Sequence, residues 1–395
     1  MPPARSASEP LAAEVFHPCA LPDRDLAAWT RLQAATPDFS SPLLSPDFAR
    51  AVGEVRADAR VAVWRRGGEA VGFLSHHQRP GRLARPVGSP FSDYHALVSA
   101  PGAIAKGPEA LALAGIRTFR FSGLIDPFGL FASVADERTE GHQVVLTDGA
   151  DAFLAALAAS SRNRAKNFRR YHARLERELG PVEIRAPNTD AAAFEQLLAW
   201  KRAQIARTGA LDFLRPAWCR ELMSRLYGRR EGAFQGLLVS LYAGSTHVAS
   251  HFGVRLGGHY HPWLGASHPD HPGLSPGFVH QWLAIGAMSA LGLDCYDLGP
   301  GYDHWKRMFA NSALTIAAGT AATSPQPARS WPLEAVWSLP SAGRVRRRLD
   351  QIAATELTLS GRVHGLVSAM ASYDRRLAAR AGELHAEDGA ERAAP

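Results

Sequence analysis

The sequence predicts an α+β protein of two mixed units followed by a helical extension. The chain has 395 residues, which is longer than a chain with a single hydrophobic core usually is. Since 46% of the residues are hydrophobic, the chain has enough apolar side chains for two cores. Two β-rich runs flank Arg66, Gly67 and Gly68, which is a strong hairpin signal in the first unit. Three strand-like runs over residues 234–267 are separated by "AGST" and "RLGGH", which indicates an antiparallel meander in the second. We place the units at residues 1–148 and 149–325 and the extension at 326–395.

Charge and cysteine content exclude some classes of protein without selecting a partner. The net charge is +7 and the sequence pI is 9.6, which suits polyanions, but an alanine- and arginine-rich composition also arises from a GC-rich genome. The three cysteines, Cys19, Cys219 and Cys295, are far apart and form no CxxC pair, which argues against a disulfide framework and a structural zinc site. The first thirty residues lack the apolar segment of a signal peptide, and no apolar run reaches about 20 residues. We therefore expect a cytoplasmic protein.

The first unit opens with a leader that looks disordered, and a short helix with polar N-cap candidates follows over residues 37–55. The hairpin occupies residues 59–78, and "IRTFRFSGLID" at residues 116–126 is typical of a buried strand. The composition turns polar over residues 138–152, where we expect the second unit to begin.

The second unit begins with the most basic helix of the chain, which ends at Gly180, and a second helix over residues 191–209 also ends at a glycine. After the meander, we expect a helix over residues 277–291, a short strand "DCYDLG", a short helix "YDHWKRMFAN" and a last strand "LTIAAGTAAT". From residue 341 onward the extension is basic and helix-prone, and its polar tail is predicted to be disordered.

The stretch "LSPGF" favours a helix start that can accept a phosphate. Ser275 suits the N-cap, Pro276 suits the first helical position, and Gly277 leaves the first turn without a side chain. Unpaired N–H groups and the positive end of the helix dipole favour an anion there. Any Ser-Pro-Gly can also start a helix without binding a ligand.

The segment "YDLGPGYDHWKRMF" offers groups for acyl transfer. Asp297 ends a strand, and Tyr302 and Lys306 lie four residues apart and so share a helix face. When an amine or hydroxyl attacks a thioester, a lysine can stabilise the oxyanion and a tyrosine can protonate the leaving thiolate. The alternative is a salt-bridged or solvent-facing lysine beside a half-buried tyrosine.

Histidines on the meander are candidates for the general base. His259 and His261 are two residues apart and point to the same face of the sheet. No third ligand accompanies them at a convincing spacing, so we predict no metal site. Asp93 and Tyr94 of "FSDYH" are candidate acceptor contacts, although a turn with a buried tyrosine explains them equally well.

The basic helix that ends at Gly180 is compatible with several kinds of ligand. Arg170 and its neighbours suit an anionic acceptor, the 3′-phosphate of a coenzyme, or nucleic acid. The alternative is a solvated face on which Glu176 and Glu178 relieve the repulsion between Arg170 and Arg174. No aromatic stacking pattern accompanies the helix, so nucleic-acid binding is not expected.

The motifs "SRNRAKNFRRYHARLE", "LLAWKRAQIARTG", "LSPG" and "YDLGPGYDHWKRMFA" together resemble the GNAT-like acetyltransferases grouped with the cellulose-biosynthesis CelD/BcsL proteins, which are related to the Fem peptidyl transferases. The resemblance covers residues 150–325 and extends more faintly through "GSPFSDYHALVSAPG". It implies two tandem GNAT-like units, with acetyl-coenzyme A or another acyl-coenzyme A bound by the second.

The resemblance also implies roles for residues of this sequence. The pyrophosphate would lie at Ser275, Pro276 and Gly277, with Phe278 beside it, and strand N–H groups from His261 to Leu264 would hold the thioester carbonyl for direct attack in a ternary complex. Lys306 resembles the lysine of Fem-type proteins, and Asp93, Tyr94, Arg170 and Asp297 are assigned to the acceptor. The glycine-rich Q/R-x-x-G-x-G/A loop of typical GNAT enzymes is replaced here by "HPGLSPG".

We therefore expect an acyltransferase that moves an acetyl group to an amino or hydroxyl group of a sugar or exopolysaccharide precursor. One alternative is a Fem-like transferase that uses aminoacyl-tRNA. The other is an inactive GNAT-fold module that binds anionic polysaccharide or a membrane surface through its basic C-terminal helices.

Overall fold

The computed structural model describes residues 9–301, 304–323, 349 and 351–367. By its internal contacts the chain divides into two compact units, one of residues 1–200 with 220–326 and one of residues 201–219 with 327–395. The first unit contains both predicted halves of the fold, which we call the first half (β1 to β7) and the second half (α4 to β13). The boundary predicted between the two halves, near residue 148, remains a prediction.

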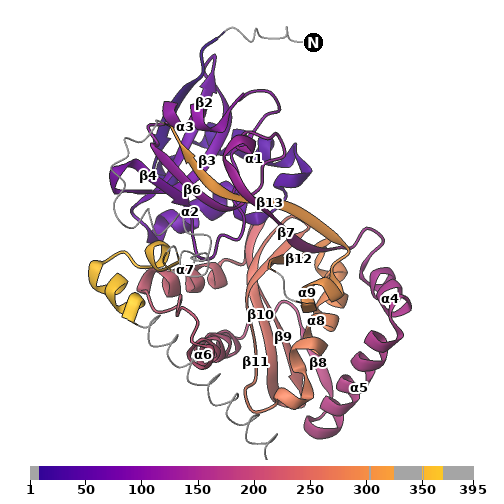
Figure 1. The fold of residues 1–395 in the computed structure, drawn as a ribbon. Coiled ribbons are helices and arrows are strands. Elements are labelled where there is room, and N and C mark those ends of the chain that lie inside the picture. Colours follow the sequence, from indigo (N-terminus) through magenta and orange to yellow (C-terminus); the bar gives the residue numbers. More distant parts are fainter. Residues whose placement is uncertain (1–8, 302–303, 324–348, 350, 368–395) are drawn as a thin grey trace, which may run out of the picture. The chain divides into compact units, whose positions relative to one another are not determined.

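The described strands form one 13-stranded sheet with the order β1-β2-β3-β4-β6-β13-β7-β12-β11-β10-β9-β8, and β5 pairs with β3 (Figure 1). The strands of the first half are β1 (Ala12–Phe16), β2 (Ala59–Arg66), β3 (Glu69–Arg79), β4 (Leu83–Pro86), β5 (Val98–Ser99), β6 (Thr118–Leu124) and β7 (Ala135–Val145). Those of the second half are β8 (Val182–Arg185), β9 (Phe234–Ala243), β10 (Thr246–Leu256), β11 (His259–Ser267), β12 (Cys295–Pro300) and β13 (Ser312–Ala322).

The strand order reads the same from both ends when β1 is matched with β8, β2 with β9, β3 with β10, β4 with β11, β6 with β12 and β7 with β13. The two halves therefore repeat one arrangement of strands. Their last strands are exchanged, because β13 lies between β6 and β7, and β7 lies between β13 and β12. This exchange joins the two halves into a continuous sheet.

Helices cover the two faces of the second half. The helices of the first unit are α1 (Asp23–Ala34), α2 (Pro46–Val55), α3 (Gly107–Leu113), α4 (Ala150–Ser160), α5 (Arg162–Leu179), α8 (Pro276–Ala287) and α9 (His304–Phe309), while α6 (Ala191–Thr208) and α7 (Ala217–Gly228) have residues in both units. On one face α4, α5 and α8 pack together, and Trp282 stacks on Phe168 with ring centroids 4.7 Å apart. On the other face Phe194 of α6 packs edge-on against Phe252 of β10.

Each half contains one parallel strand pair, and the two pairs differ beyond their last paired residues. In the second half β11 pairs with β12 only at His259 and Tyr260, after which β11 continues beside β10 alone. The edges of β11 and β12 therefore part beyond these residues. In the first half the corresponding opening beside β6 is closed by His95, whose N–H donates to Gly123 O (3.2 Å) and whose carbonyl accepts from Ile125 N (2.8 Å). Among the described residues, no bridge of this kind follows the paired residues of β11 and β12 in the second half.

The α+β class is confirmed, as are the hairpin of β2 and β3, the meander of β9 to β11 and the helix stop at Gly180. The expected disorder of the leader is wrong for residues 12–34, which form β1 and α1. Amphipathic α1 buries Trp29, whose indole N–H donates to Leu44 O (3.0 Å). No sequence signal indicated β7, because its outward side chains are polar, as in "ADERTE".

The smaller of these two compact units, residues 201–219 with 327–395, has a core of its own. The indole N–H of Trp218 donates to Thr355 O (3.0 Å), Arg215 pairs with Glu356, and Ile352 is 2% exposed. Residues 351–355 and 359–367 are helical, as predicted for the extension. None of the described helices has both the length and the apolar character needed to span a membrane.

Candidate active site

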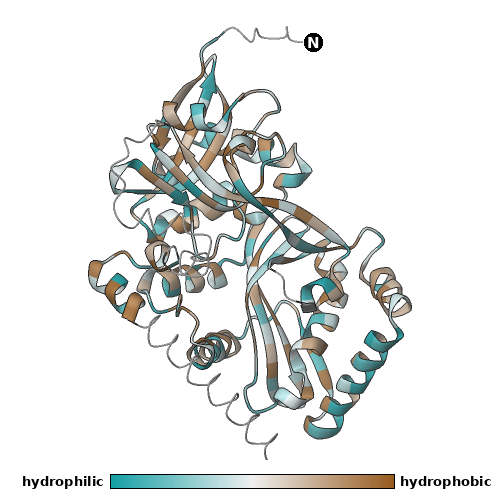
Figure 2. Ribbon diagram, viewed as in Figure 1, coloured by the Kyte–Doolittle hydropathy of each residue, from teal (hydrophilic) through white to brown (hydrophobic). Residues whose placement is uncertain are grey.

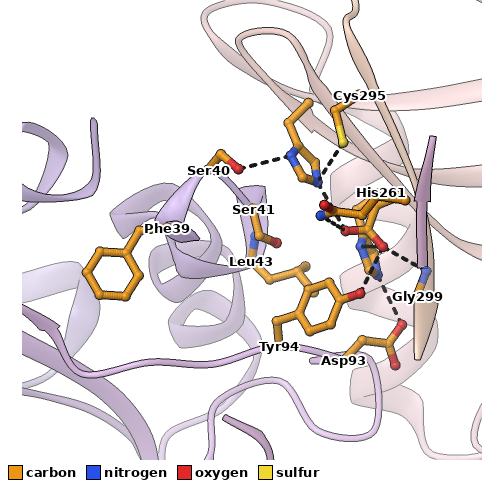
Figure 3. A network of polar contacts seen from close by, with 12 residues as sticks. Phe39, Ser40, Ser41, Leu43, Asp93, Tyr94, His261, Cys295 and Gly299 are labelled. Atoms are coloured by element: carbon orange, nitrogen blue, oxygen red, sulfur yellow. Dashed lines mark hydrogen bonds and ion pairs between the residues drawn. The ribbon is translucent and has the colours of Figure 1, made fainter. Parts of the chain in front are cut away.

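A buried polar cluster lies where β11 and β12 part. His259 and His261 of β11 and Asp297 of β12 are each at most 4% exposed, and Asp93 and Tyr94 reach them from the first half (Figure 3). The period of two along β11 places both histidines on one face, as the sequence predicted. The structure thus brings together five of the predicted site residues.

Asp297 is the centre of the cluster. Its Oδ1 accepts from the Tyr94 hydroxyl (2.9 Å) and from Gly299 N (2.7 Å), and its Oδ2 accepts from Gln143 Nε2 (2.9 Å) and lies 3.3 Å from His259 Nε2. Burial acts to raise the pKa of Asp297, but the charge of His261 and the hydrogen bond from His259 outweigh it and hold the pKa well below its usual range. The carboxylate therefore stays ionised inside the sheet and fixes the groups around it.

His261 lies between two carboxylates. Its Nε2 is 3.0 Å from Asp93 Oδ2, and its Nδ1 makes an ion-pair contact of 3.5 Å with Asp297 Oδ1. Burial acts to lower the pKa of His261, but Asp297 and Asp93 outweigh it and raise the pKa to about 9. The ring is therefore an imidazolium at neutral pH. Of the three groups only Asp93 reaches solvent, with 34% of its side chain exposed.

His259 has a different environment. Its Nδ1 lies 3.3 Å from the Ser40 hydroxyl and its Nε2 faces Asp297, so both ring nitrogens have partners. Cys295 Sγ is 3.9 Å from His259 Nε2, and burial raises the pKa of this thiol well above its usual range. Cys295 therefore remains a protonated, unreactive thiol.

The cluster supplies the third metal-ligand candidate that the sequence spacing did not reveal. One ligand atom each from His259, His261 and Asp297 lies within 4.8 Å of the others. Asp297 lies on the neighbouring strand, so its distance from the histidines along the sequence did not identify it as a third ligand. Its oxygens already accept hydrogen bonds from Tyr94, Gly299 and Gln143, so the cluster is held together without an ion.

Lys306 approaches the same place from α9. A Cβ placed on Gly299 would lie 3.2 Å from Asp93 Oδ2, 3.8 Å from Lys306 Nζ and 3.9 Å from His261 Cε1. Three charged groups therefore converge on one point of the β12 backbone, where a φ of 73° suits glycine. Lys306 Nζ also donates to Pro300 O (2.5 Å). Tyr302 lies outside the described residues.

The start of α8 lies at the far end of β11. The helix begins at Pro276 as predicted, but Ser275 adopts a left-handed conformation (φ 51°) and its side chain makes no capping hydrogen bond. Its carbonyl instead accepts from Phe278 N (3.1 Å) and Val279 N (3.4 Å). A Cβ on Gly277 would meet nothing within 4 Å, so space lies beside the first-turn N–H groups.

Basic side chains of α5 lie beside this helix start. Arg174 Nη1 donates to Gly273 O (3.2 Å), Arg170 donates to the Tyr171 hydroxyl (2.9 Å), and Tyr171 packs edge-on against Phe278. Figure 2 shows α5 as largely hydrophilic. The contacts of Arg170 thus lie on the α8 side rather than with Asp93. Arg174 also pairs with Glu178 (2.8 Å), which was expected, whereas Glu176 pairs with His172.

Leu264 is buried on β11 opposite Phe252. Because Pro262 has no N–H, the amides of His261, Trp263 and Leu264 are the donors that this part of the strand can offer.

Part of the chain that carries this site is similar to a known family. Residues 162–307 match the family described as acetyltransferase (GNAT) domain. The match includes the meander, α8, β12 and Lys306, and it establishes an enzyme of the acyltransferase class without giving its acceptor. Domains of this family generally use acyl-coenzyme A.

One solved structure supports the fold, and two others are less similar. FemX is 10% identical with a TM-score of 0.51, and the alignment covers 79% of this chain and 97% of FemX. A tandem GNAT protein from the clavulanic acid biosynthesis pathway is 12% identical with a TM-score of 0.47, covering 80% of this chain and all of that chain. L-PGS from Bacillus licheniformis is 12% identical with a TM-score of 0.43, covering 80% and 96%. The likeness to FemX concerns the fold alone, and the other two carry no argument about this chain. No curated protein matches the sequence significantly.

Two residues of the cluster were missed by sequence reasoning. Ser40 lies in a loop between two short 3-10 helices, and Gln143 lies on the exchanged strand β7. Neither belongs to a local motif, and each reaches the cluster only through the three-dimensional arrangement of the strands.

Proposed function

We propose that the protein transfers an acetyl group from acetyl-coenzyme A to an amino or hydroxyl group of a sugar or exopolysaccharide precursor. The observation that carries this proposal is that β11 and β12 part beyond Tyr260 and Tyr296, close to where Asp93, His261 and Lys306 converge at Gly299. A thioester and a nucleophile have to meet at such a point between a donor side and an acceptor side.

The donor side is assigned to the start of α8. The pyrophosphate would accept a hydrogen bond from the N–H of Gly277, and Arg170 and Arg174 would add positive charge. The pantetheine arm would then lie beside β11 where it parts from β12. There the amides of His261, Trp263 and Leu264 are the candidates to hold the thioester carbonyl.

The acceptor side is assigned to Asp93 and Lys306. The acceptor nitrogen or oxygen attacks the thioester carbon, forming the new C–N or C–O bond, and its proton passes to the Asp93 carboxylate. Lys306 stabilises the oxyanion. The C–S bond then breaks, and the thiolate leaves and takes a proton, for which Tyr302 remains the candidate donor. Tyr94 is a positioning residue, since it donates to the buried Asp297.

We propose a different role for His261 from the general base that the sequence suggested. Its two carboxylate neighbours raise its pKa to about 9, so in this proposal its ring is protonated at neutral pH and another group is the base. The ring instead holds Asp93 by a charged hydrogen bond of 3.0 Å. In the proposal Asp93 accepts the proton, and His261 and Asp297 fix its position. His259, whose ring nitrogens face Ser40 and Asp297, supports Asp297 in the same way.

A sugar acceptor is supported by Trp305, which precedes Lys306 and is 39% exposed. Its ring centroid is 5.7 Å from Lys306 Nζ, so a flat apolar face lies beside the charged groups. Sugar rings stack on such faces while their hydroxyl and amino groups bind charged partners.

The test combines donor binding with turnover. Acetyl-coenzyme A should raise the melting temperature of the wild-type protein, and thiol release from acetyl-coenzyme A should be stimulated by an amino sugar such as glucosamine. Asp93→Asn should leave the thermal shift intact and reduce thiol release by at least about a hundredfold. A protein that millimolar acetyl-coenzyme A does not stabilise, or an Asp93→Asn variant with full turnover, would contradict the proposal.

Aminoacyl-tRNA is the alternative donor that the net charge of +7 and the basic α5 favour. It predicts that tRNA stabilises the protein whereas acetyl-coenzyme A does not.

Association with an anionic membrane surface is a separate proposal for the smaller compact unit, residues 201–219 with 327–395. The helical residues 359–367 expose Leu359 (79%), Val363 (51%) and Val367 (60%), which repeat at helical spacing. Sedimentation with vesicles that contain phosphatidylglycerol, compared with phosphatidylcholine vesicles, tests it.

A further inference from the structure

Ser40, His259 and Asp297 form a chain of polar contacts that runs from the surface into the buried cluster. The Ser40 hydroxyl lies 3.3 Å from His259 Nδ1, and His259 Nε2 lies 3.3 Å from Asp297 Oδ2. Figure 3 shows Ser40 at the outer end of this chain. Ser40 is exposed, whereas the side chains of His259 and Asp297 are 5% and 0% exposed. An exposed hydroxyl, a histidine and a buried carboxylate in this order are the parts of a nucleophilic serine centre.

The ionised state of Asp297 sets the tautomer of His259. Burial acts to raise the pKa of Asp297, but the charge of His261 and the hydrogen bond from His259 outweigh it, so the group is a carboxylate. A carboxylate can only accept hydrogen bonds, so the proton of the neutral His259 ring lies on Nε2. Nδ1 therefore keeps its lone pair toward Ser40 and can accept the proton of the hydroxyl.

The backbone around Ser40 is held in place from both sides. Gln33 Nε2 donates to Phe39 O and to Ser41 O, both at 3.0 Å. Phe39 and Ser41 are 0% and 1% exposed, so the exposed Ser40 stands between two buried neighbours. Ser40 N also donates to Pro37 O (3.0 Å). A hydroxyl that is positioned in this way loses little conformational entropy when it reacts.

Protonation of His259 keeps the charges of the cluster balanced. His261 is already an imidazolium between Asp93 and Asp297. When His259 takes a proton from Ser40, two imidazolium rings face two carboxylates, so neither ring lacks a negative partner. The new charge on His259 is stabilised by Asp297, whose Oδ2 faces Nε2.

We propose that Ser40 is a nucleophile that forms an acyl-enzyme with small carboxylic esters, with His259 as its base and Asp297 as the residue that positions the base. Ser40 Oγ bonds to the ester carbonyl carbon while its proton passes to His259 Nδ1. The carbon–oxygen bond of the ester then breaks, and the leaving alkoxide takes this proton. Water attacks the acyl-serine next; its proton passes to Nδ1 and from there to Ser40 Oγ as the carboxylic acid leaves. This hydrolysis requires neither the acyl donor nor the acceptor of the proposed function.

The test uses p-nitrophenyl acetate as the probe, mixed with the full chain without coenzyme A or sugar. The wild type should release p-nitrophenol, and mass spectrometry of the acid-quenched protein should find the acetyl group on Ser40. Ser40→Ala should remove this modification, and His259→Gln should slow it by at least about a hundredfold. Ser160→Ala is the matched control and should behave like the wild type, because Ser160 is an exposed serine whose hydroxyl donates to Leu157 O (2.9 Å) rather than to a histidine.

Each outcome decides between a nucleophile and a purely structural contact. Acetylation that is confined to other residues, or p-nitrophenol release that is unchanged in Ser40→Ala, overturns the proposal. Full acetylation of Ser40 in His259→Gln shows that the histidine is not the base, which also overturns it. Neither result affects the acyl-coenzyme A donor, since the assay contains none. Ser40→Gly repeats the comparison if the alanine variant does not fold.

Discussion

Stability should decrease as the pH rises from 6.5 to 8.5, because His261 binds its proton more tightly in the folded protein. Its pKa is about 9 in the cluster, against an ordinary value of 6.5 in the unfolded chain. A raised pKa contributes stability that is complete below the unfolded value and is lost as the pH rises through the folded value. Integrating this difference between pH 6.5 and 8.5 gives a loss of about 2 kcal/mol in the free energy of unfolding.

Stability should also fall on the acid side of pH 6.5, for the opposite reason. Burial lowers the pKa of five other histidines in the folded protein. As the pH falls below their pKa in the unfolded chain, the unfolded chain binds protons that the folded protein does not, so the free energy of unfolding decreases. The pKa is about 4 for four of these, His76, His77, His247 and His280, and about 3 for His95. The protein should therefore be most stable near pH 6.5.

Urea denaturation followed by tryptophan fluorescence at several pH values measures this dependence directly. His261→Gln should be less stable than the wild type at pH 6.5 and should lose the decline toward pH 8.5. Asp93→Asn removes one of the two carboxylates that hold the proton, so its decline should end at a lower pH. A wild-type stability that is flat or rising over this range, or an unchanged decline in His261→Gln, would show that the ring is not charged in the folded protein.

Three further variants test the site from other directions. Gly141→Ala places a Cβ in collision with the Tyr94 hydroxyl, so the tyrosine must lose its hydrogen bond to Asp297. The free energy of unfolding, measured by urea denaturation, should fall by about 2–3 kcal/mol. An unchanged value would refute the contact. Lys306→Ala should lower kcat about a hundredfold with little change in the Kd of acetyl-coenzyme A, and full turnover would remove the lysine from the mechanism. Replacing both Arg170 and Arg174 by glutamine should weaken acetyl-coenzyme A binding about tenfold and make the binding less dependent on salt concentration. A change in the KM of the acceptor alone would instead place Arg170 on the acceptor side.

The sequence predicted those parts of the fold that local signals define. Gly67 and Gly68 indicated the hairpin, Pro276 indicated the start of α8, and the period of two along β11 placed His259 and His261 on one face. The partner of these histidines, Asp297, could not be deduced as such, because its contact depends on β12 lying parallel to β11 after a crossover.

The segment around His95 distinguishes the two similar halves. In the first half the backbone of His95 bonds to β6 at the place where β11 and β12 of the second half part, so our proposal assigns the acyl donor to the second half alone. The two residues that precede His95, Asp93 and Tyr94, reach the cluster of the second half instead, at 3.0 Å from His261 and 2.9 Å from Asp297. One short segment thus closes the opening in the first half and completes the site in the second. We therefore expect one molecule of acyl donor per chain, and a titration that gave two would contradict this division of roles.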